Sequence, residues 1–208
     1  SPTLPIKCVV KIYKTKWKGF SANKNFGAEK TKNQWILCPD ADEILNEELI
    51  KNIMTLKLEE NEAYAMNRRT WFGDTAVRYS GWFPDWNIRL YNKNKMSWNA
   101  NQVHEKLEST SPINIKKIQG IIEHLSFRDE NHMISKFDHY ARMRANEWVD
   151  SGKKLSWLKT TFGPAFRMFK TYVIKLGFLD GKVGYTIAKN EYYLKRKEIN
   201  YFQKFKKV

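Results

Sequence analysis

The sequence is poor in cysteine and contains no long apolar run. Two cysteines in 208 residues, Cys8 and Cys38, exclude a disulfide-stapled scaffold and a cysteine zinc cage. No run of about 18 apolar residues is present, so no segment is expected to span a membrane as a helix. The sequence also contains no internal repeat and no recognisable signal peptide. These absences predict a cytoplasmic, globular chain with reduced thiols.

Positive charge is in excess and is unevenly distributed. The 37 Lys and Arg residues outnumber the 22 Asp and Glu residues and give a net charge of +15. Residues 1–150 carry 23 basic and 19 acidic residues, whereas residues 151–208 carry 14 basic and three acidic residues. An apolar fraction of 42% is enough for a hydrophobic core and excludes a disordered chain. The pattern indicates a nearly balanced body followed by a basic tail.

The order of predicted elements favours an α/β fold. Strand patterns at Cys8–Tyr13 and Gln34–Cys38 alternate with helical patterns at Ala22–Lys30 and from Ile44 to Leu56. Such alternation is typical of a parallel sheet. From Ala63 to Leu107 the segments become short and aromatic-rich, which predicts strands joined by turns.

Two carboxylates directly follow the second predicted strand. Because residues two apart in an extended segment project to the same side, Asp40 and Asp42 are expected where open α/β sheets bind ligands. Their oxygens suit Mg²⁺ or Mn²⁺ bridging a diphosphate. The alternative is structural, with Asp42 capping a helix over Glu43–Leu58 and Asp40 exposed to solvent.

Short motifs follow one another in a specific order along the chain. They are Trp17-Lys18-Gly19-Phe20, Asn23-Lys24-Asn25, Asp40-Ala41-Asp42-Glu43, Gly81-Trp82-Phe83-Pro84-Asp85, Arg89-Leu90-Tyr91, Val103-His104-Glu105, Glu123-His124, Tyr140-Ala141, Gly152-Lys153-Lys154, Gly163-Pro164 and Gly177-Phe178-Leu179-Asp180-Gly181. From Val10 onward the chain resembles the family 2 glycosyltransferases of the GT-A fold. The resemblance is closest to the bacterial enzymes that add sugars to lipopolysaccharide or lipooligosaccharide cores.

This resemblance implies how the chain is organised. Residues 1–150 are expected to form a partial, Rossmann-like GT-A domain, with a mixed sheet flanked by helices, and residues 151–208 a basic helical tail. The family begins with an apolar strand and a Tyr-Asn-Glu type loop that grips the nucleotide base. Ser1–Ile6 stands where that segment should end, so we expect the domain to be N-terminally incomplete.

The resemblance also implies an inverting transfer from a nucleotide-sugar donor to a lipid-linked saccharide, with a divalent cation, Mg²⁺ or Mn²⁺, on the leaving diphosphate. Asp40 and Asp42 match the acidic motif that contacts the ribose and the metal-bridged pyrophosphate. Lys24 and Asn25 lie near a predicted helix N-terminus, which suits the donor, although an exposed position on a surface helix is the alternative. His124 is the predicted metal ligand beside Asp42.

Two carboxylates are candidates for the catalytic base. Glu105 is favoured because it follows His104 in a segment that the family places near the acceptor. Asp85 lies between an aromatic turn and a predicted strand, so it is expected to orient the acceptor or to act as the base instead.

The tail contains an apolar stripe beside basic residues. After a helix predicted at Met133–Ser151, a second helix is predicted at Trp157–Leu179, with an interruption at Gly163-Pro164. Such a basic amphipathic helix binds anionic membrane surfaces, here the inner face of the cytoplasmic membrane. The alternative is that its apolar side packs on the catalytic domain. The stripe consists of Phe162, Phe166, Phe169, Val173 and Leu176, and the basic residues beside it are Arg167, Lys170 and Lys175.

Two other functions are compatible with the composition. A net charge of +15 with interleaved aromatic residues would suit a nucleic-acid-binding protein. The basic residues gather in the tail, however, and no RNA-binding or DNA-binding module is recognisable, so we expect no nucleic-acid partner. The remaining alternative is an inactive glycosyltransferase fragment that retains the acceptor half.

Overall fold

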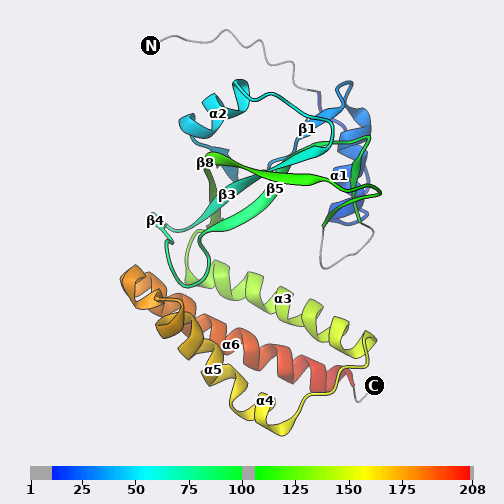
Figure 1. Cartoon of the computed structure of the whole chain (residues 1–208). Helices are drawn as coiled ribbons and strands as arrows, with labels where there is room; N and C mark the ends of the chain where they lie inside the picture. Colours follow the sequence, from blue (N-terminus) through cyan, green and yellow to red (C-terminus); the bar gives the residue numbers. More distant parts are fainter. Residues whose placement is uncertain (1–10, 100–105, 207–208) are drawn as a thin grey trace.

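The computed structural model describes residues 11–99 and 106–206, and it places a mixed sheet over a layer of helices (Figure 1). The main sheet confirms the predicted α/β fold with a mixed sheet flanked by helices. Its strands follow the order β1 (Trp35–Leu37), β5 (Asp85–Asn92), β3 (Glu62–Phe72), β8 (Asn114–Phe127) and β2 (Glu43–Leu45), with β4 (Thr75–Ala76) paired to β3.

The parallel pairing that the alternation of the first elements indicated is wrong for β1 and β2, which pair antiparallel with β5 and β8. Among the described strands only β3 and β8 pair in parallel, and the other ladders are antiparallel. Strands β1 and β2 are close in sequence, yet they lie at opposite edges of the sheet and pair with β5 and β8. Within the strand predicted at Cys8–Tyr13, residues 11–13 have no regular structure and residues 8–10 lie outside the described range.

Helix α2 (Glu47–Met54) begins later than the apolar periodicity predicts. Residues 43–45 form β2 instead, because they pair with β8. The side chain of Asn46 caps α2 by accepting a hydrogen bond from Leu49 N at 2.9 Å, and it also accepts one from Ile121 N at 3.0 Å. Asp42 is therefore not a helix cap and lies in the turn before β2. Helix α1 (Phe20–Lys30) forms close to its predicted range.

The aromatic-rich middle of the chain forms strands, as predicted. Strand β3 runs unbroken through 11 residues, and β6 (Met96–Trp98) pairs with β7 (Leu107–Ser109) in a small second sheet. The middle of α1 is held against this small sheet, since Asn25 Nδ2 donates to Trp98 O and Asn25 Oδ1 accepts from Trp98 N, both at 2.9 Å.

The helical layer begins with α3 (Glu130–Asp150), which confirms the predicted helix at Met133–Ser151. The helix predicted at Trp157–Leu179 is interrupted at Gly163-Pro164, as predicted, and it is broken twice more before the long α6 (Gly181–Phe205). Pro164 lies in the first turn of the second piece, where it is tolerated but where it ends the preceding helix. The pieces are α4 (Trp157–Thr161), α5 (Gly163–Phe169), the π-helical turn η1 (Lys170–Ile174) and the 3₁₀ turn η2 (Gly177–Asp180).

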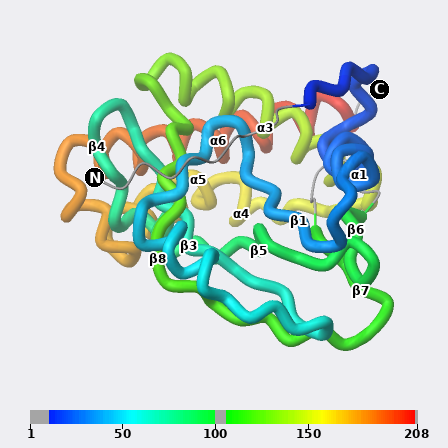
Figure 2. The backbone as a smooth tube through the Cα atoms, turned by 90° about the horizontal axis from the view of Figure 1, so that it is seen from above, coloured from blue at the N-terminus to red at the C-terminus, as the bar shows by residue number. Residues whose placement is uncertain are grey.

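The helices after residue 150 share a hydrophobic core with the rest of the chain. Helix α6 lies beside α3 (Figure 2), and Ile187 and Leu194 pack with Phe127 at the end of β8 and with α3. The carboxylate of Asp180 accepts hydrogen bonds from Arg78 N and Tyr79 N, both at 3.0 Å. These contacts hold the tail against the sheet region. The domain boundary predicted at residue 150 stays a prediction.

No helix within the described residues is long and apolar enough to cross a membrane.

Candidate active site

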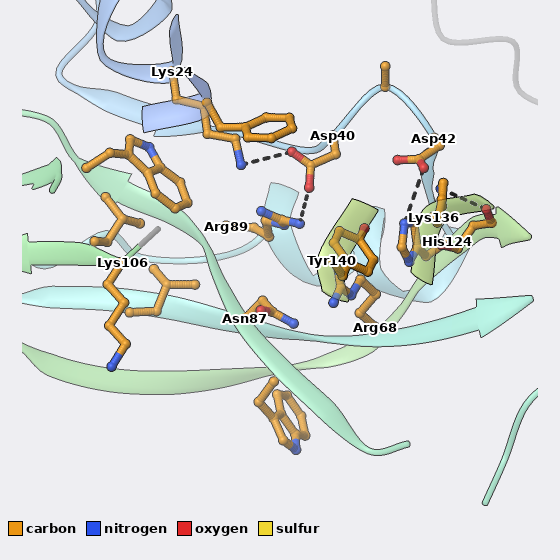
Figure 3. Close-up of a pocket in the computed structure, with 17 residues that line it drawn as sticks. Lys24, Asp40, Asp42, Arg68, Asn87, Arg89, Lys106, His124, Lys136 and Tyr140 are labelled. Atoms are coloured by element: carbon orange, nitrogen blue, oxygen red, sulfur yellow. Dashed lines mark hydrogen bonds and ion pairs between the residues drawn. The ribbon is translucent and has the colours of Figure 1, made fainter. Parts of the chain in front are cut away.

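A cavity of about 1060 Å³ opens beside the sheet, between α1, the turn before β2 and α3. Asp40 and Asp42 both line it, as the sequence predicts. Five basic side chains line the cavity together with these two acids, so the cavity carries a net positive charge that favours an anionic ligand. The basic residues are Lys24, Arg68, Arg89, Lys106 and Lys136 (Figure 3).

Asp40 lies between two cations. Its carboxylate is 3.1 Å from Lys24 Nζ and 2.7 Å from Arg89 Nη2 (Figure 3). Burial alone would raise the pKa of Asp40, but the charges of Arg89 and Lys24 outweigh burial and lower it. Asp40 is therefore ionised at neutral pH and holds both cations at the cavity wall.

The ion pairs continue beneath the cavity through a fully buried glutamate. Glu43, whose side chain is 0% exposed, accepts a hydrogen bond from Arg89 and lies 3.6 Å from Arg68 Nη1. Arg68 in turn contacts Asp85, with Nη2 2.7 Å from Oδ2. Alternating charges thus link the Asp40 side of the cavity to Asp85, the predicted acceptor-side carboxylate.

Asp42 and His124 meet where β2 pairs with β8. His124 Nε2 lies 3.3 Å from Asp42 Oδ2 (Figure 3). Burial, together with the charge on Arg68, lowers the pKa of His124, so its ring is neutral at neutral pH and can act as a metal ligand. Asp40 and Asp42 therefore line one cavity but engage different partners.

Of the other predicted site residues, Asn25 lies outside the cavity and Glu105 lies outside the described residues. Asn25 does not line the cavity, because both ends of its amide bind the backbone of Trp98. Glu105 and the neighbouring His104 lie outside the described residues, and the proposed role of Glu105 as base stays a prediction.

Comparison with known proteins identifies the family. The sequence model described as glycosyl transferase family 2 matches residues 6–122, more than half of the chain. The chain belongs to glycosyltransferase family 2.

Curated relatives agree with this assignment. An uncharacterised glycosyltransferase of Rickettsia typhi is 28% identical over 198 residues, covering 88% of this chain and 65% of the relative. A lipopolysaccharide core biosynthesis glycosyltransferase, LpsC of Rhizobium meliloti, is 25% identical over 164 residues, covering 75% of this chain and 58% of the relative. The chain spans less than two thirds of the length of these relatives.

Several residues of the glycosyltransferase cavity were not predicted from the sequence. Lys136 and Tyr140 lie four residues apart on α3 and both face the cavity, and Lys136 Nζ donates to Ser126 O at 2.9 Å. Their helical spacing places them on one face of the helix, but no local pattern indicates that this face meets the sheet. Asn87 and Lys106 also line the cavity, on β5 and beside β7.

Proposed function

We propose that this protein is an inverting glycosyltransferase that moves a sugar from a nucleotide-sugar donor to a lipid-linked saccharide such as a lipopolysaccharide core. The main support is the cavity of a family 2 chain that five basic side chains line together with Asp40 and Asp42. The name of the Rhizobium relative, which concerns lipopolysaccharide core biosynthesis, supports the choice of acceptor. The test is transfer from UDP-, GDP- and ADP-sugars to lipopolysaccharide of cells that lack this gene.

The donor would lie in the basic cavity. Lys24 and Arg68 are placed to bind the diphosphate, which would replace part of their present ion pairing with Asp40 and Asp85. Asn25 would act indirectly, by holding α1 and hence Lys24 against the small sheet.

Asp42 and His124 would hold a divalent cation. Within the described residues no group of three or more His, Cys, Asp or Glu side chains is placed to bind a metal ion. Two protein ligands nevertheless fit Mg²⁺ or Mn²⁺ here, because such ions take one or two carboxylates and fill the other positions with substrate phosphates and water. A bound cation would neutralise charge on the leaving diphosphate.

The proposed reaction is a single displacement. The acceptor hydroxyl oxygen forms a bond to the anomeric carbon of the donor sugar, and the bond from that carbon to the phosphate oxygen breaks. The nucleoside diphosphate leaves with the bonding electrons, and a carboxylate takes the hydroxyl proton. Glu105 is the base favoured by the sequence, whereas the position of Asp85 beside Arg68 and the cavity supports Asp85.

The Asp42→Ala variant is expected to lose its response to added cation. Removing one of two protein ligands should lower kcat/KM with Mn²⁺ by about 100-fold, because the diphosphate charge is then poorly neutralised. The measurement is the rate of transfer during a titration with MnCl₂. The matched control is Asp74→Ala, which changes an exposed aspartate in the turn between β3 and β4. An Asp42→Ala enzyme with the wild-type MnCl₂ curve would remove Asp42 from the metal site.

We further propose that the protein binds the inner face of the cytoplasmic membrane through its α4–α5 apolar surface, defined as the exposed apolar residues of 157–179. The five residues of the predicted stripe are 44–59% exposed, so they are not packed on the catalytic domain. Arg167 differs from the prediction, because it turns inward to Glu191 and Glu198. Exposed lysines accompany the surface and each adds about 1 kcal/mol near anionic lipid. They are Lys154, Lys159, Lys170, Lys175 and Lys182.

Replacing three phenylalanines of this surface by serine is expected to weaken binding to vesicles that contain phosphatidylglycerol. The triple variant Phe162→Ser, Phe166→Ser, Phe169→Ser should lose at least about tenfold in affinity, because aromatic area no longer enters the lipid interface. Co-sedimentation with these vesicles and with pure phosphatidylcholine vesicles measures the effect.

The matched control replaces three exposed apolar residues near α2, with Ile44→Ser, Ile50→Ser and Met54→Ser. Equal binding by the two triple variants would exclude the α4–α5 apolar surface as the contact. Salt-sensitive binding to oligonucleotides without binding to either vesicle would instead favour the nucleic-acid alternative.

A further inference from the structure

A second cavity, of about 530 Å³, lies between the sheet and the helical layer. It adjoins the donor cavity, because Arg68, His124, Ser126 and Tyr140 line both. Its other walls come from segments far apart in the sequence, namely β3, the turn before β5, β8 and the helices α3, α5 and α6. The helical layer thus forms one wall of a space next to the donor cavity.

The charge in the second cavity differs from that in the donor cavity. Three arginines line it, and three carboxylates, those of Asp85, Glu191 and Glu198, balance them. Most of these groups are already paired, since Arg68 contacts Asp85, and Arg167 donates to Glu191 and, at 3.2 Å, to Glu198. An additional anion would have to break these pairs, so an anionic ligand is disfavoured.

Uncharged hydroxyl groups suit a cavity lined by paired arginines and carboxylates better than ions do. A hydroxyl can donate to a carboxylate and accept from a guanidinium at the same time, without adding net charge. Aromatic side chains supply apolar contact area in the same space, as small-molecule sites usually require. These aromatic residues are Trp82, Phe127, Phe137 and Tyr140.

The position of Asp85 indicates which part of the second cavity lies nearest the donor cavity. Asp85 lines the second cavity, and its partner Arg68 lines both cavities. A hydroxyl bound beside Asp85 would therefore face the donor across Arg68. Arg167 of α5 also lines the cavity, and the same helix carries Phe166 and Phe169 of the α4–α5 apolar surface.

We infer that the second cavity is the acceptor subsite, that it binds an uncharged, multiply hydroxylated sugar ring, and that Glu191 and Arg167 bind hydroxyls of that ring. This inference rests on the proposed glycosyl transfer. It extends the proposal by assigning acceptor recognition to the helices α5 and α6 and by naming the chemistry of the ring that receives the new sugar.

The experiment measures KM for donor and acceptor in Glu191→Gln. The acceptor is the core oligosaccharide obtained by removing the acyl chains from lipopolysaccharide of cells that lack this gene. The amide keeps the shape of the side chain but loses the charge that strengthens hydrogen bonds from hydroxyls. We expect the acceptor KM to rise about tenfold, while the donor KM and the acceptor-free hydrolysis of the donor change less than about twofold.

Two further variants keep the test decisive. Glu130→Gln is the matched control, because Glu130 is also ion-paired, to Lys189, but lies outside the second cavity. If Glu191→Gln fails to fold, the double variant Arg167→Gln, Glu191→Gln replaces the ion pair by two amides and leaves no single unpaired charge between them. A wild-type acceptor KM in the folded variants would overturn the inference.

The outcomes also separate this inference from the proposed function. If the wild-type protein neither binds nor hydrolyses any nucleotide sugar, both the proposed function and the acceptor subsite are overturned. If transfer occurs but Glu191→Gln and Glu130→Gln have equal acceptor KM values, only the acceptor subsite fails. A phosphorylated acceptor ring that is used at least as well as its dephosphorylated form would overturn the assignment of an uncharged ring.

Discussion

Asp85→Asn is expected to lower kcat about 10³-fold while the donor still binds with near wild-type affinity. An amide cannot take the proton of the attacking hydroxyl, and general-base catalysis contributes about 10²–10⁴-fold to such rates. Asp85 is suited to this role because it lies beside Arg68 at the junction of the two cavities. Single-turnover kinetics with donor binding measured separately would resolve the chemical step from binding.

The companion variant is Glu105→Gln, since the sequence favours Glu105 as the base. Near wild-type kcat in Glu105→Gln, with the loss confined to Asp85→Asn, would assign the base to Asp85. The reverse pattern, in which Glu105→Gln loses turnover and Asp85→Asn mainly raises the acceptor KM, would assign the base to Glu105. Asp85 would then be an acceptor-orienting residue.

Glu43→Ala is expected to lower the free energy of unfolding by about 3–5 kcal/mol. Glu43 is fully buried between Arg89 and Arg68, and removing one partner of a buried pair leaves uncompensated charge in a low-dielectric interior. Arg89 is itself only 4% exposed, so water cannot easily replace the lost carboxylate. Urea unfolding followed by circular dichroism measures the change.

Glu60→Ala is the matched control for this variant. Glu60 is exposed in the turn before β3, so its removal should change the free energy of unfolding by less than about 0.5 kcal/mol. A similarly small change in Glu43→Ala would mean that Arg68 and Arg89 find other partners. The line of alternating charges from Asp40 to Asp85 would then not stabilise the fold.

The two cavities differ in their balance of basic and acidic side chains. The donor cavity has more basic than acidic side chains, whereas the second cavity has equal numbers of arginines and carboxylates. Under the proposed function, electrostatics would sort a negatively charged donor from an uncharged acceptor ring before any sugar hydroxyl is recognised. Arg68 lines both cavities and lies between Glu43 and Asp85, so its position sets the boundary between them.

Much of the site could be predicted from the sequence because its signals are local. Asp40, Asp42 and Lys24 all line the donor cavity, and His124 lies against Asp42, as the ordered motifs indicated. The apolar stripe of the tail is exposed, as its spacing beside basic residues suggested. These features depend on which residues follow a strand or share a helix face.

Other features depended on strand pairing and could not be predicted. The pairing of Glu43 with His124 makes residues 43–45 a strand and moves the helix start to Asn46, although local periodicity favours a helix there. Arg167 belongs to a basic helical pattern, yet it turns inward because Glu191 and Glu198 face it from α6. Each partner is tens of residues away along the chain.

The sequence by itself determined the family, the α/β class, the acidic residues of the donor cavity and the basic, apolar tail. The tertiary structure alone decided that Asp40 and Asp42 engage different partners, that one line of charges joins Asp40 to Asp85, and that the tail helices line a second cavity. The physical reason is that residue type and spacing specify which chemistry is present. The long-range packing of strands and helices specifies which of these groups meet.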